Sequence, residues 1–200
     1  MRKINQIESE LLPKLKELVI YAHSKNVEIT IDAEEQDRLS LSLHIIENLA
    51  NEKKIKDWPG FGIALQAYGK RSFDVIHWLS EILTKRDSIH LRLVKGAYWD
   101  YEIKHAQVSG YEGYPVFSKK SFTDIAYLAC AKEILKNKKI FPKFATHNAH
   151  TISSIHHIGK NYNYEFQRLY GMGELLYKSA SEVLGVNRSP SVYALSLIHI

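Results

Sequence analysis

The segment His90–Asp100, with the sequence HLRLVKGAYWD, brings several chemically useful groups together where a strand should end. Its first residues alternate between apolar and polar side chains, which indicates a β-strand. The strand is followed at once by Lys95, two small residues, Tyr98 and Trp99. A strand that serves only the core more often turns through Asn, Asp or Pro. This segment instead presents a cation, uncovered backbone and flat rings together, which suits the binding of a planar ligand.

Polar groups also follow other short segments with strand character. The ends of these segments carry Asp32, Gln66, Thr146, His147, Asn148, Gln167, Leu169 and Tyr193. With Arg92 and Lys95, the set supplies two cations, aromatic rings, amides and hydroxyl groups. This combination fits a large, flat, electron-accepting ring that carries phosphates, and a flavin meets that description. Nothing in the spacing identifies a substrate.

Several of these residues also have a simpler structural explanation. Asp32 could cap the helix that follows it, because Asp is a favoured N-cap residue. Gln66 could be an internally satisfied polar group of a barrel. A helix N-cap with an incidental histidine could be formed by Thr146, His147 and Asn148.

Helical and strand patterns alternate along the chain. Apolar spacing predicts helices over 7–26, 37–51, 72–86, 122–138, 150–161 and 173–184. Alternating and β-branched runs predict strands over 27–35, 62–69, 89–97, 143–149 and 164–171, with a further stretch from 191. This order, without a Gly-rich phosphate fingerprint after the first strand, favours a (β/α)8 barrel over a doubly wound sheet. Because such a barrel needs eight strands, we expect an incomplete α/β barrel of the TIM type, with active residues at the carboxyl ends of its strands.

The composition narrows the class of protein further. The chain of 200 residues has a net charge of +5, but its lysines are interleaved with acids on helix faces, so we expect no nucleic-acid binding. Cys130 is the only cysteine, which excludes an intrachain disulfide and fits a cytoplasmic protein. His147 and His150 are three residues apart, but no carboxylate or cysteine completes a metal site at a recognisable spacing, so we expect no metal.

Five segments are more informative together than separately: IDAEEQDRLSLSL, LQAYGKR, LRLVKGAYWDYEIKHAQVSGYEGYPVF, FATHNAHT and YEFQRLYGMGELLY. In order and spacing they resemble the proline dehydrogenase domain of the bacterial proline utilisation A flavoenzymes. The pair RLVKGAYWD and ATHNAH is highly specific, and the resemblance covers residues 1–194 as a partial barrel. It implies FAD-dependent oxidation of L-proline to Δ1-pyrroline-5-carboxylate, with the electrons passed to a membrane quinone.

The resemblance also implies a role for each strand-end residue. Arg92 would lie near the flavin N5, and Gln66 would hydrogen-bond the ring. The other residues expected to contact the ring, the ribityl chain or the diphosphate are Val94, Lys95, Gly96, Ala97, Trp99, Thr146, His147, Asn148 and Gln167. Asp32 would support the site from beneath. The proline pocket would be formed by Tyr98, Leu169 and Tyr193.

The sequence also differs from the family pattern, and these differences lead to further expectations. The first barrel strand of the family, with its active-site lysine, would precede Met1, so we expect strands two to seven here, without the first and last. No Tyr-x-x-Arg-Arg motif is present to bind the proline carboxylate, so we expect the fragment alone to be inactive. The DNA-binding, arm and aldehyde dehydrogenase segments are also absent. Peripheral membrane association is expected only of the full-length protein.

The end of the chain raises two alternatives. Its last six residues, LSLIHI, match the translation of a transposon end used to prepare sequencing libraries, so we expect 195–200 to be a non-native tail. A divergent natural terminus is the other interpretation. The missing arginines and first strand also leave open a different class of function, a non-catalytic remnant or interaction module of the same barrel. A metal hydrolase or another barrel flavoenzyme has only THNAH in its favour.

Overall fold

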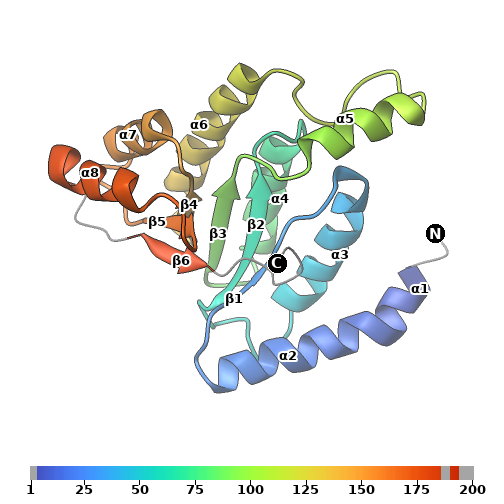
Figure 1. Cartoon of the computed structure of the whole chain (residues 1–200). Helices are drawn as coiled ribbons and strands as arrows, with labels where there is room; N and C mark the ends of the chain where they lie inside the picture. The colour runs from blue at the N-terminus through green and yellow to red at the C-terminus, as the bar shows by residue number, and fades with distance from the viewer. Residues whose placement is uncertain (1–3, 186–189, 194–200) are drawn as a thin grey trace.

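A computed structural model describes residues 4–185 and 190–193 of the chain. Six parallel strands form one curled sheet in chain order (Figure 1). They are β1 Ile29–Ile31, β2 Phe61–Gln66, β3 Ile89–Val94, β4 Ile140–Ala145, β5 Glu165–Leu169 and β6 Ser191–Tyr193. Neighbouring strands that follow one another along the chain are the connectivity of a (β/α)8 barrel. The predicted incomplete α/β barrel is therefore confirmed.

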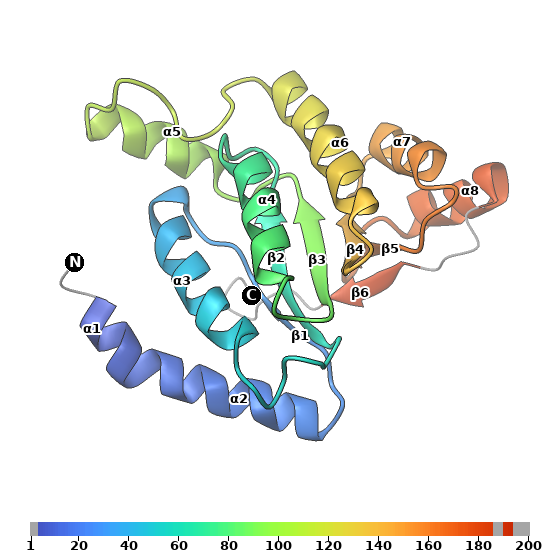
Figure 2. The ribbon, with the colours of Figure 1, turned by 180° about the vertical axis from the view of Figure 1, so that it is seen from behind.

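Helices connect the strands and cover the outer face of the sheet. They are α1 Ile4–Gln6, the π-helical turn η1 Ile7–Leu11, α2 Leu12–Ser24, the 3-10 turn η2 Gln36–Arg38, α3 Leu39–Ala50, α4 Ser72–Ile82, α5 Trp99–Val108, α6 Lys120–Lys136, α7 Ala149–Ile158 and α8 Glu174–Leu184. Seen from behind, α4 and α6 stand in front of the strands, with α3 and α7 on either side of them (Figure 2). Helix α5 was not predicted. Strand β4 begins three residues before its predicted start, because Ile140 is already buried and pairs with Ile89.

Alternate positions of each strand face the helices, as the two-residue period of a strand requires. The apolar set Ile63, Leu65, Leu91, Leu93, Phe144 and Phe166 belongs to the same buried core as the inner faces of the helices. Two buried tyrosines fasten the helices to the strand ends. Tyr127 in α6 donates to the Leu93 carbonyl at 3.1 Å, and Tyr177 in α8 donates to the Thr146 carbonyl at 2.8 Å.

The opposite face of the sheet is polar. Adjacent strands place Ala64, Arg92, Lys143 and Glu165 side by side in register. His90 is also buried on this face, and its Nε2 lies 2.9 Å from the Thr30 hydroxyl. Gly62 makes room for it, since a Cβ at this position would lie 1.7 Å from the His90 ring.

His90 should make the stability of the barrel sensitive to acid. Burial, assisted by repulsion from Lys143, lowers the pKa of His90 from 6.5 to about 4. The unfolded chain therefore binds a proton first as the pH falls, and stability present above pH 6.5 is lost toward pH 4. The full loss is about 3 kcal/mol. Scanning fluorimetry should show that the melting temperature of the complete protein falls further between pH 7 and pH 5 than that of its His90→Gln variant. Equal falls in the two proteins would contradict this role of His90.

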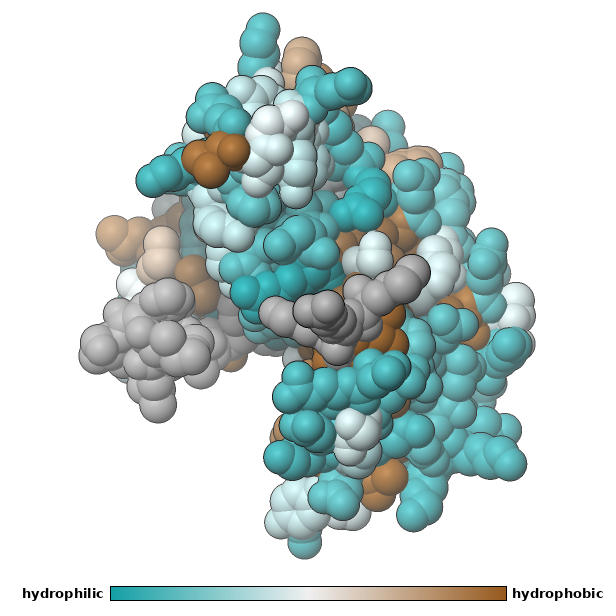
Figure 3. Space-filling view, turned by 90° about the vertical axis from the view of Figure 1, so that its right-hand side faces the viewer, coloured by the Kyte–Doolittle hydropathy of each residue, from teal (hydrophilic) through white to brown (hydrophobic). Residues whose placement is uncertain are grey.

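The face in Figure 3 is mostly hydrophilic, with hydrophobic residues in small separate groups. Scattered apolar side chains of this kind are normal on globular proteins. Within the described ranges, no helix has both the length and the apolar character needed to cross a membrane. The expected tail at 195–200 lies outside the described residues.

Candidate functional site

A cavity of about 800 Å³ lies at the carboxyl ends of the strands. Its lining comes from strands β2 and β3, from the loops that follow β1, β3 and β4, from the first residue of α6 and from the last residues of β4 and β5: Asp32, Ala33, Glu34, Ala64, Gln66, Arg92, Val94, Lys95, Gly96, Ala97, Tyr98, Lys120, Ala145, Thr146, His147, Asn148 and Leu169. Twelve residues of this lining were predicted from the sequence as site residues: Asp32, Gln66, Arg92, Val94, Lys95, Gly96, Ala97, Tyr98, Thr146, His147, Asn148 and Leu169. The structure therefore brings most of the predicted set to one place.

Arg92 is the central cation of the cavity floor. Its Nε donates to Gln167 Oε1 at 2.8 Å, and its Nη1 donates to Asp32 Oδ1 at 2.7 Å. Asp32 forms this ion pair and does not cap the helix that follows it, so the capping alternative is wrong. Both Arg92 and Gln167 are buried, which makes this guanidinium a fixed positive charge and not a mobile surface group.

Gln66 joins the loop after β1 to the loop after β3. Its Nε2 donates to the Glu34 carbonyl at 2.8 Å, and its Oε1 accepts from the Ala97 amide at 2.9 Å. The interpretation of Gln66 as an internally satisfied polar group is thus correct. Its oxygen is occupied, while one N–H of the amide is used by the Glu34 carbonyl.

Tyr98 contacts a residue that sequence reasoning missed. Its hydroxyl donates to Glu34 Oε2 at 2.8 Å. Partial burial and this hydrogen bond raise the pKa of Tyr98 to about 12, so its hydroxyl stays protonated at neutral pH. Glu34 lies two residues after Asp32, and residues two apart in extended backbone point to the same side. That spacing was the available signal for Glu34.

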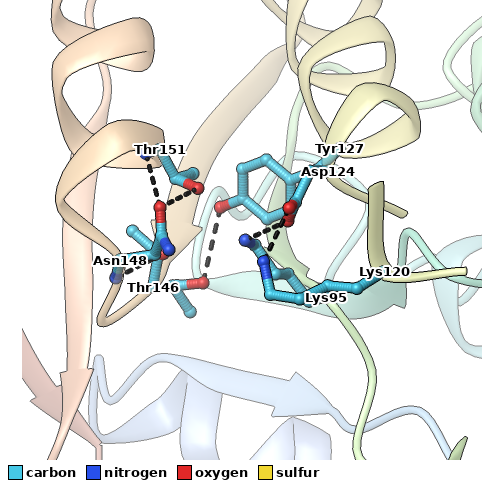
Figure 4. A network of polar contacts seen from close by, with 8 residues as sticks. Lys95, Lys120, Asp124, Tyr127, Thr146, Asn148 and Thr151 are labelled. Atoms are coloured by element: carbon cyan, nitrogen blue, oxygen red, sulfur yellow. Dashed lines mark hydrogen bonds and ion pairs between the residues drawn. The ribbon is translucent and has the colours of Figure 1, made fainter. Parts of the chain in front are cut away.

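Two lysines converge on one carboxylate at the edge of the cavity (Figure 4). Lys95 and Lys120 both donate to Asp124, the second at 2.6 Å. Partial burial opposes ionisation of Asp124, but the hydrogen bonds from Lys120 and Lys95 outweigh it and lower its pKa. The cluster keeps one positive charge in excess, which suits a phosphate group. Lys120 and Asp124 were not predicted as site residues, although their spacing of four places them on one helix face.

The loop after β3 brings bare backbone to the cavity. Gly96 has φ +141°, which L side chains rarely adopt, and a Cβ there would lie 2.5 Å from the Tyr68 ring. Trp99 is partly exposed, and its Nε1 donates to the Phe117 carbonyl at 2.9 Å. A flat ligand can approach the Gly96–Ala97 backbone because no side chain of Gly96 stands in the way.

The loop after β4 combines structural and accessible groups. Asn148 caps α7 by accepting from the Thr151 amide at 2.9 Å, so the N-cap interpretation is correct for Asn148. His147 Nε2 accepts from the Leu169 amide at 3.1 Å. Partial burial, with repulsion from Arg168, lowers the pKa of His147 and favours the neutral ring that this bond requires.

Two predictions remain to be placed. The backbone of Tyr193 ends β6 opposite Leu169, but its side chain lies outside the described part of the structure. Within residues 4–185 and 190–193, His, Cys, Asp and Glu form no group of three or more that could hold a metal ion.

Comparison with known protein families matches residues 2–195 to the family described as proline dehydrogenase. The chain belongs to the proline dehydrogenase family. The bifunctional protein PutA of Salmonella typhimurium is 46% identical over 199 residues, and that of Rhizobium meliloti is 41% identical over 201 residues. These alignments cover 95% and 96% of the chain. The proline dehydrogenase chain spans 15% and 16% of the two relatives.

Solved structures give the same assignment of the proline dehydrogenase fold. A crystal structure of a proline utilization A mutant from Bradyrhizobium japonicum matches with a TM-score of 0.91 and 42% identity, over 96% of this chain and 20% of that one. Proline utilization A from Bdellovibrio bacteriovorus, inactivated by N-propargylglycine, matches with a TM-score of 0.89 and 34% identity over 97% of this chain and 21% of that one. The cavity therefore lies within a proline dehydrogenase domain.

Proposed function

We propose that the protein containing this chain oxidises L-proline to Δ1-pyrroline-5-carboxylate with FAD and passes the electrons to a quinone. Membership of the proline dehydrogenase family supports the reaction. The proposed location is cytoplasmic, with peripheral association of the full-length protein at the membrane that holds the quinone. Residues 1–194 form the partial catalytic barrel in this proposal, and 195–200 are the non-native tail.

The observation that carries the proposal is the composition of the cavity at the strand ends. A buried guanidinium, two lysines around one carboxylate, and uncovered backbone at Gly96 meet the needs of a planar, phosphate-bearing cofactor. When bound, FAD would accept a hydride from the proline carbon next to the nitrogen. Arg92 would face the ring as a preorganised positive charge, while Lys95 and Lys120 would bind the diphosphate.

The remaining predicted residues would hold this arrangement and enclose the substrate. Gln66 would fix the separation of the two loops that flank the ring. Proposed contacts of the cofactor's ring, ribityl chain or diphosphate come from Val94, Ala97, Trp99, Thr146, His147, Asn148 and Gln167. The proposed proline pocket consists of Tyr98, Leu169 and Tyr193. Tyr98 would act through its ring, because its hydroxyl hydrogen is already donated to Glu34 and its raised pKa leaves the hydroxyl protonated.

The direct test is expression of the complete gene. The purified protein should be yellow with bound flavin and should reduce a dye only when proline is added. A complete protein with neither property would reject the proposal and favour the alternative of a non-catalytic remnant or interaction module. Sequencing across both ends of the locus tests the proposed tail, since a natural coding sequence continuing in place of LSLIHI supports it.

The isolated chain of 200 residues should aggregate and should not oxidise proline. Within the described ranges β1 and β6 pair on one side only, and unpaired strand edges promote association between chains. The buried charges of the inner face are also no longer shielded from water, as they would be in a closed barrel. The free energy of unfolding of a typical domain is only about 5–15 kcal/mol, so such losses weigh heavily. Size-exclusion chromatography with excess FAD measures this. A monodisperse yellow chain that is bleached by proline would contradict the prediction.

A further inference from the structure

A row of polar side chains runs from the cavity floor into the barrel interior. Arg92 donates to Gln167, and Gln167 Nε2 donates to Glu165 Oε1 at 2.8 Å. The same Glu165 oxygen lies 3.5 Å from Lys143 Nζ, which also donates to Glu28 Oε2 at 2.5 Å. Arg92, Gln167 and Lys143 are all buried, whereas Glu28 lies at the exposed end of the row. We call Arg92, Gln167, Glu165 and Lys143 the interior polar row.

The amide of Gln167 gives the row a direction. An amide can rotate by half a turn and exchange its oxygen with its NH2 group, and packing alone distinguishes the two orientations poorly. Arg92 only donates, so it requires the amide oxygen on its side. An ionised carboxylate only accepts, so Glu165 requires the NH2 group on the other side. The two demands are met together in the orientation that the structure contains.

Lys143 accounts for the position of Glu165. The two residues lie side by side in register on β4 and β5, and the ammonium group holds the carboxylate that orients Gln167. Lys143 itself is buried, and it is not among the described residues that line the cavity. Lys143 pairs in register with both Arg92 and Glu165, so the side-chain contacts and not the strand pairing give the row its order.

We propose that Glu165 is a positioning residue which, held by Lys143, orients Gln167 and thereby fixes the guanidinium of Arg92 toward the reacting ring. The inference rests on the proposed function, since it assigns Arg92 to a bound FAD. Without the carboxylate, the NH2 end of the Gln167 amide loses its partner, and Arg92 alone orients the amide. The guanidinium would then be held at Nε by a less firmly oriented amide, while its bond from Nη1 to Asp32 remains.

A double-mutant cycle in the complete protein tests this proposal. In Glu165→Gln the new side chain has nearly the same size as the natural one, but its amide can also present a hydrogen-bond donor to Gln167. It should lower kcat by about 10- to 100-fold, as displacement of a positioning group does, with the KM for proline changed less than about threefold. The reduction potential of bound FAD should shift in the same direction as in Arg92→Met. In the Arg92→Met background, Glu165→Gln should have no further effect on either quantity.

Two further variants keep the test decisive. Gln167→Leu removes the amide without removing Glu165, and it should reproduce the loss of kcat and the shift of potential. Glu133→Gln is the matched control, because Glu133 lies on α6, pairs only with Lys136 in the described structure and lines no part of the cavity. This control should behave as the unchanged protein. A crystal structure of Glu165→Gln should show the Gln167 amide or the Arg92 guanidinium rotated.

The outcomes separate the inference from the proposed function. Additive effects of Glu165→Gln and Arg92→Met on kcat, or an unchanged potential in Glu165→Gln with flavin bound, would overturn the positioning role and leave the proposed function standing. Lower stability with unchanged kcat and potential would overturn it as well. A complete protein without any substitution that neither binds flavin nor oxidises proline would overturn both the positioning role and the proposed function.

Discussion

Replacement of Arg92 by Met is expected to lower the turnover of proline by about 100- to 1,000-fold in the complete protein. It should also make the reduction potential of bound FAD more negative. Arg92 is a buried cation at the cavity floor, held by Gln167 and Asp32, so it requires no reorganisation when negative charge develops beside it. A preorganised charge of this kind favours the electron-rich form of an acceptor. Dye-coupled kinetics and spectroelectrochemistry measure the two quantities.

Two comparisons show whether the charge of Arg92 or its bulk matters. Arg92→Lys keeps the charge but loses the planar pair of bonds to Gln167 and Asp32, so it should recover the potential better than the turnover. Lys136→Met removes a cation of α6 whose described partner is Glu133, and it should change neither quantity. An Arg92→Met protein with an unchanged potential would show that Arg92 does not act on the cofactor through its charge.

The barrel was predictable because it rests on local patterns. Alternating apolar residues in 62–66 and 89–94 identify strands, and the helical runs between them require parallel connections. In a parallel barrel all strand ends meet at one rim, so Gln66, Arg92 and His147 could be placed together without any contact being known. Helix α5 escaped prediction because only Glu102 and Ala106 are buried on it, which leaves no apolar stripe in the sequence.

The polar contacts of the site could not be predicted, because their partners are distant in the chain. Lys143 would be taken for a solvated lysine by composition alone, yet it is buried against Glu28, 115 residues earlier. Gln66 binds backbone groups of residues 34 and 97, and backbone groups leave no mark in a sequence. The sequence therefore identified most of the side chains that reach the cavity, while the three-dimensional structure shows which of them are already bonded to one another.

Replacement of Gly96 by Val should weaken both folding and cofactor binding. The positive φ of +141° is strained for any L side chain, and a Cβ would lie 2.5 Å from the Tyr68 ring. Backbone strain of this kind costs about 1–3 kcal/mol. Because Gly96 lines the cavity, relief of the clash would move the loop that carries Lys95 and Ala97. The Kd for FAD in the complete protein should therefore rise by about 100-fold, the equivalent of about 3 kcal/mol, when measured by flavin fluorescence titration.

Two other glycines separate the contributions of strain and collision. Gly110 has φ +67° with open space around it, so Gly110→Val should lower the melting temperature through strain but leave the Kd for FAD unchanged. Gly113 has open space and no positive φ, so Gly113→Val should alter neither quantity. The three variants introduce the same side chain, and only the one at Gly96 collides with an aromatic ring, that of Tyr68. If Gly96→Val bound FAD as tightly as Gly110→Val, the loop after β3 would not be the surface on which the cofactor lies.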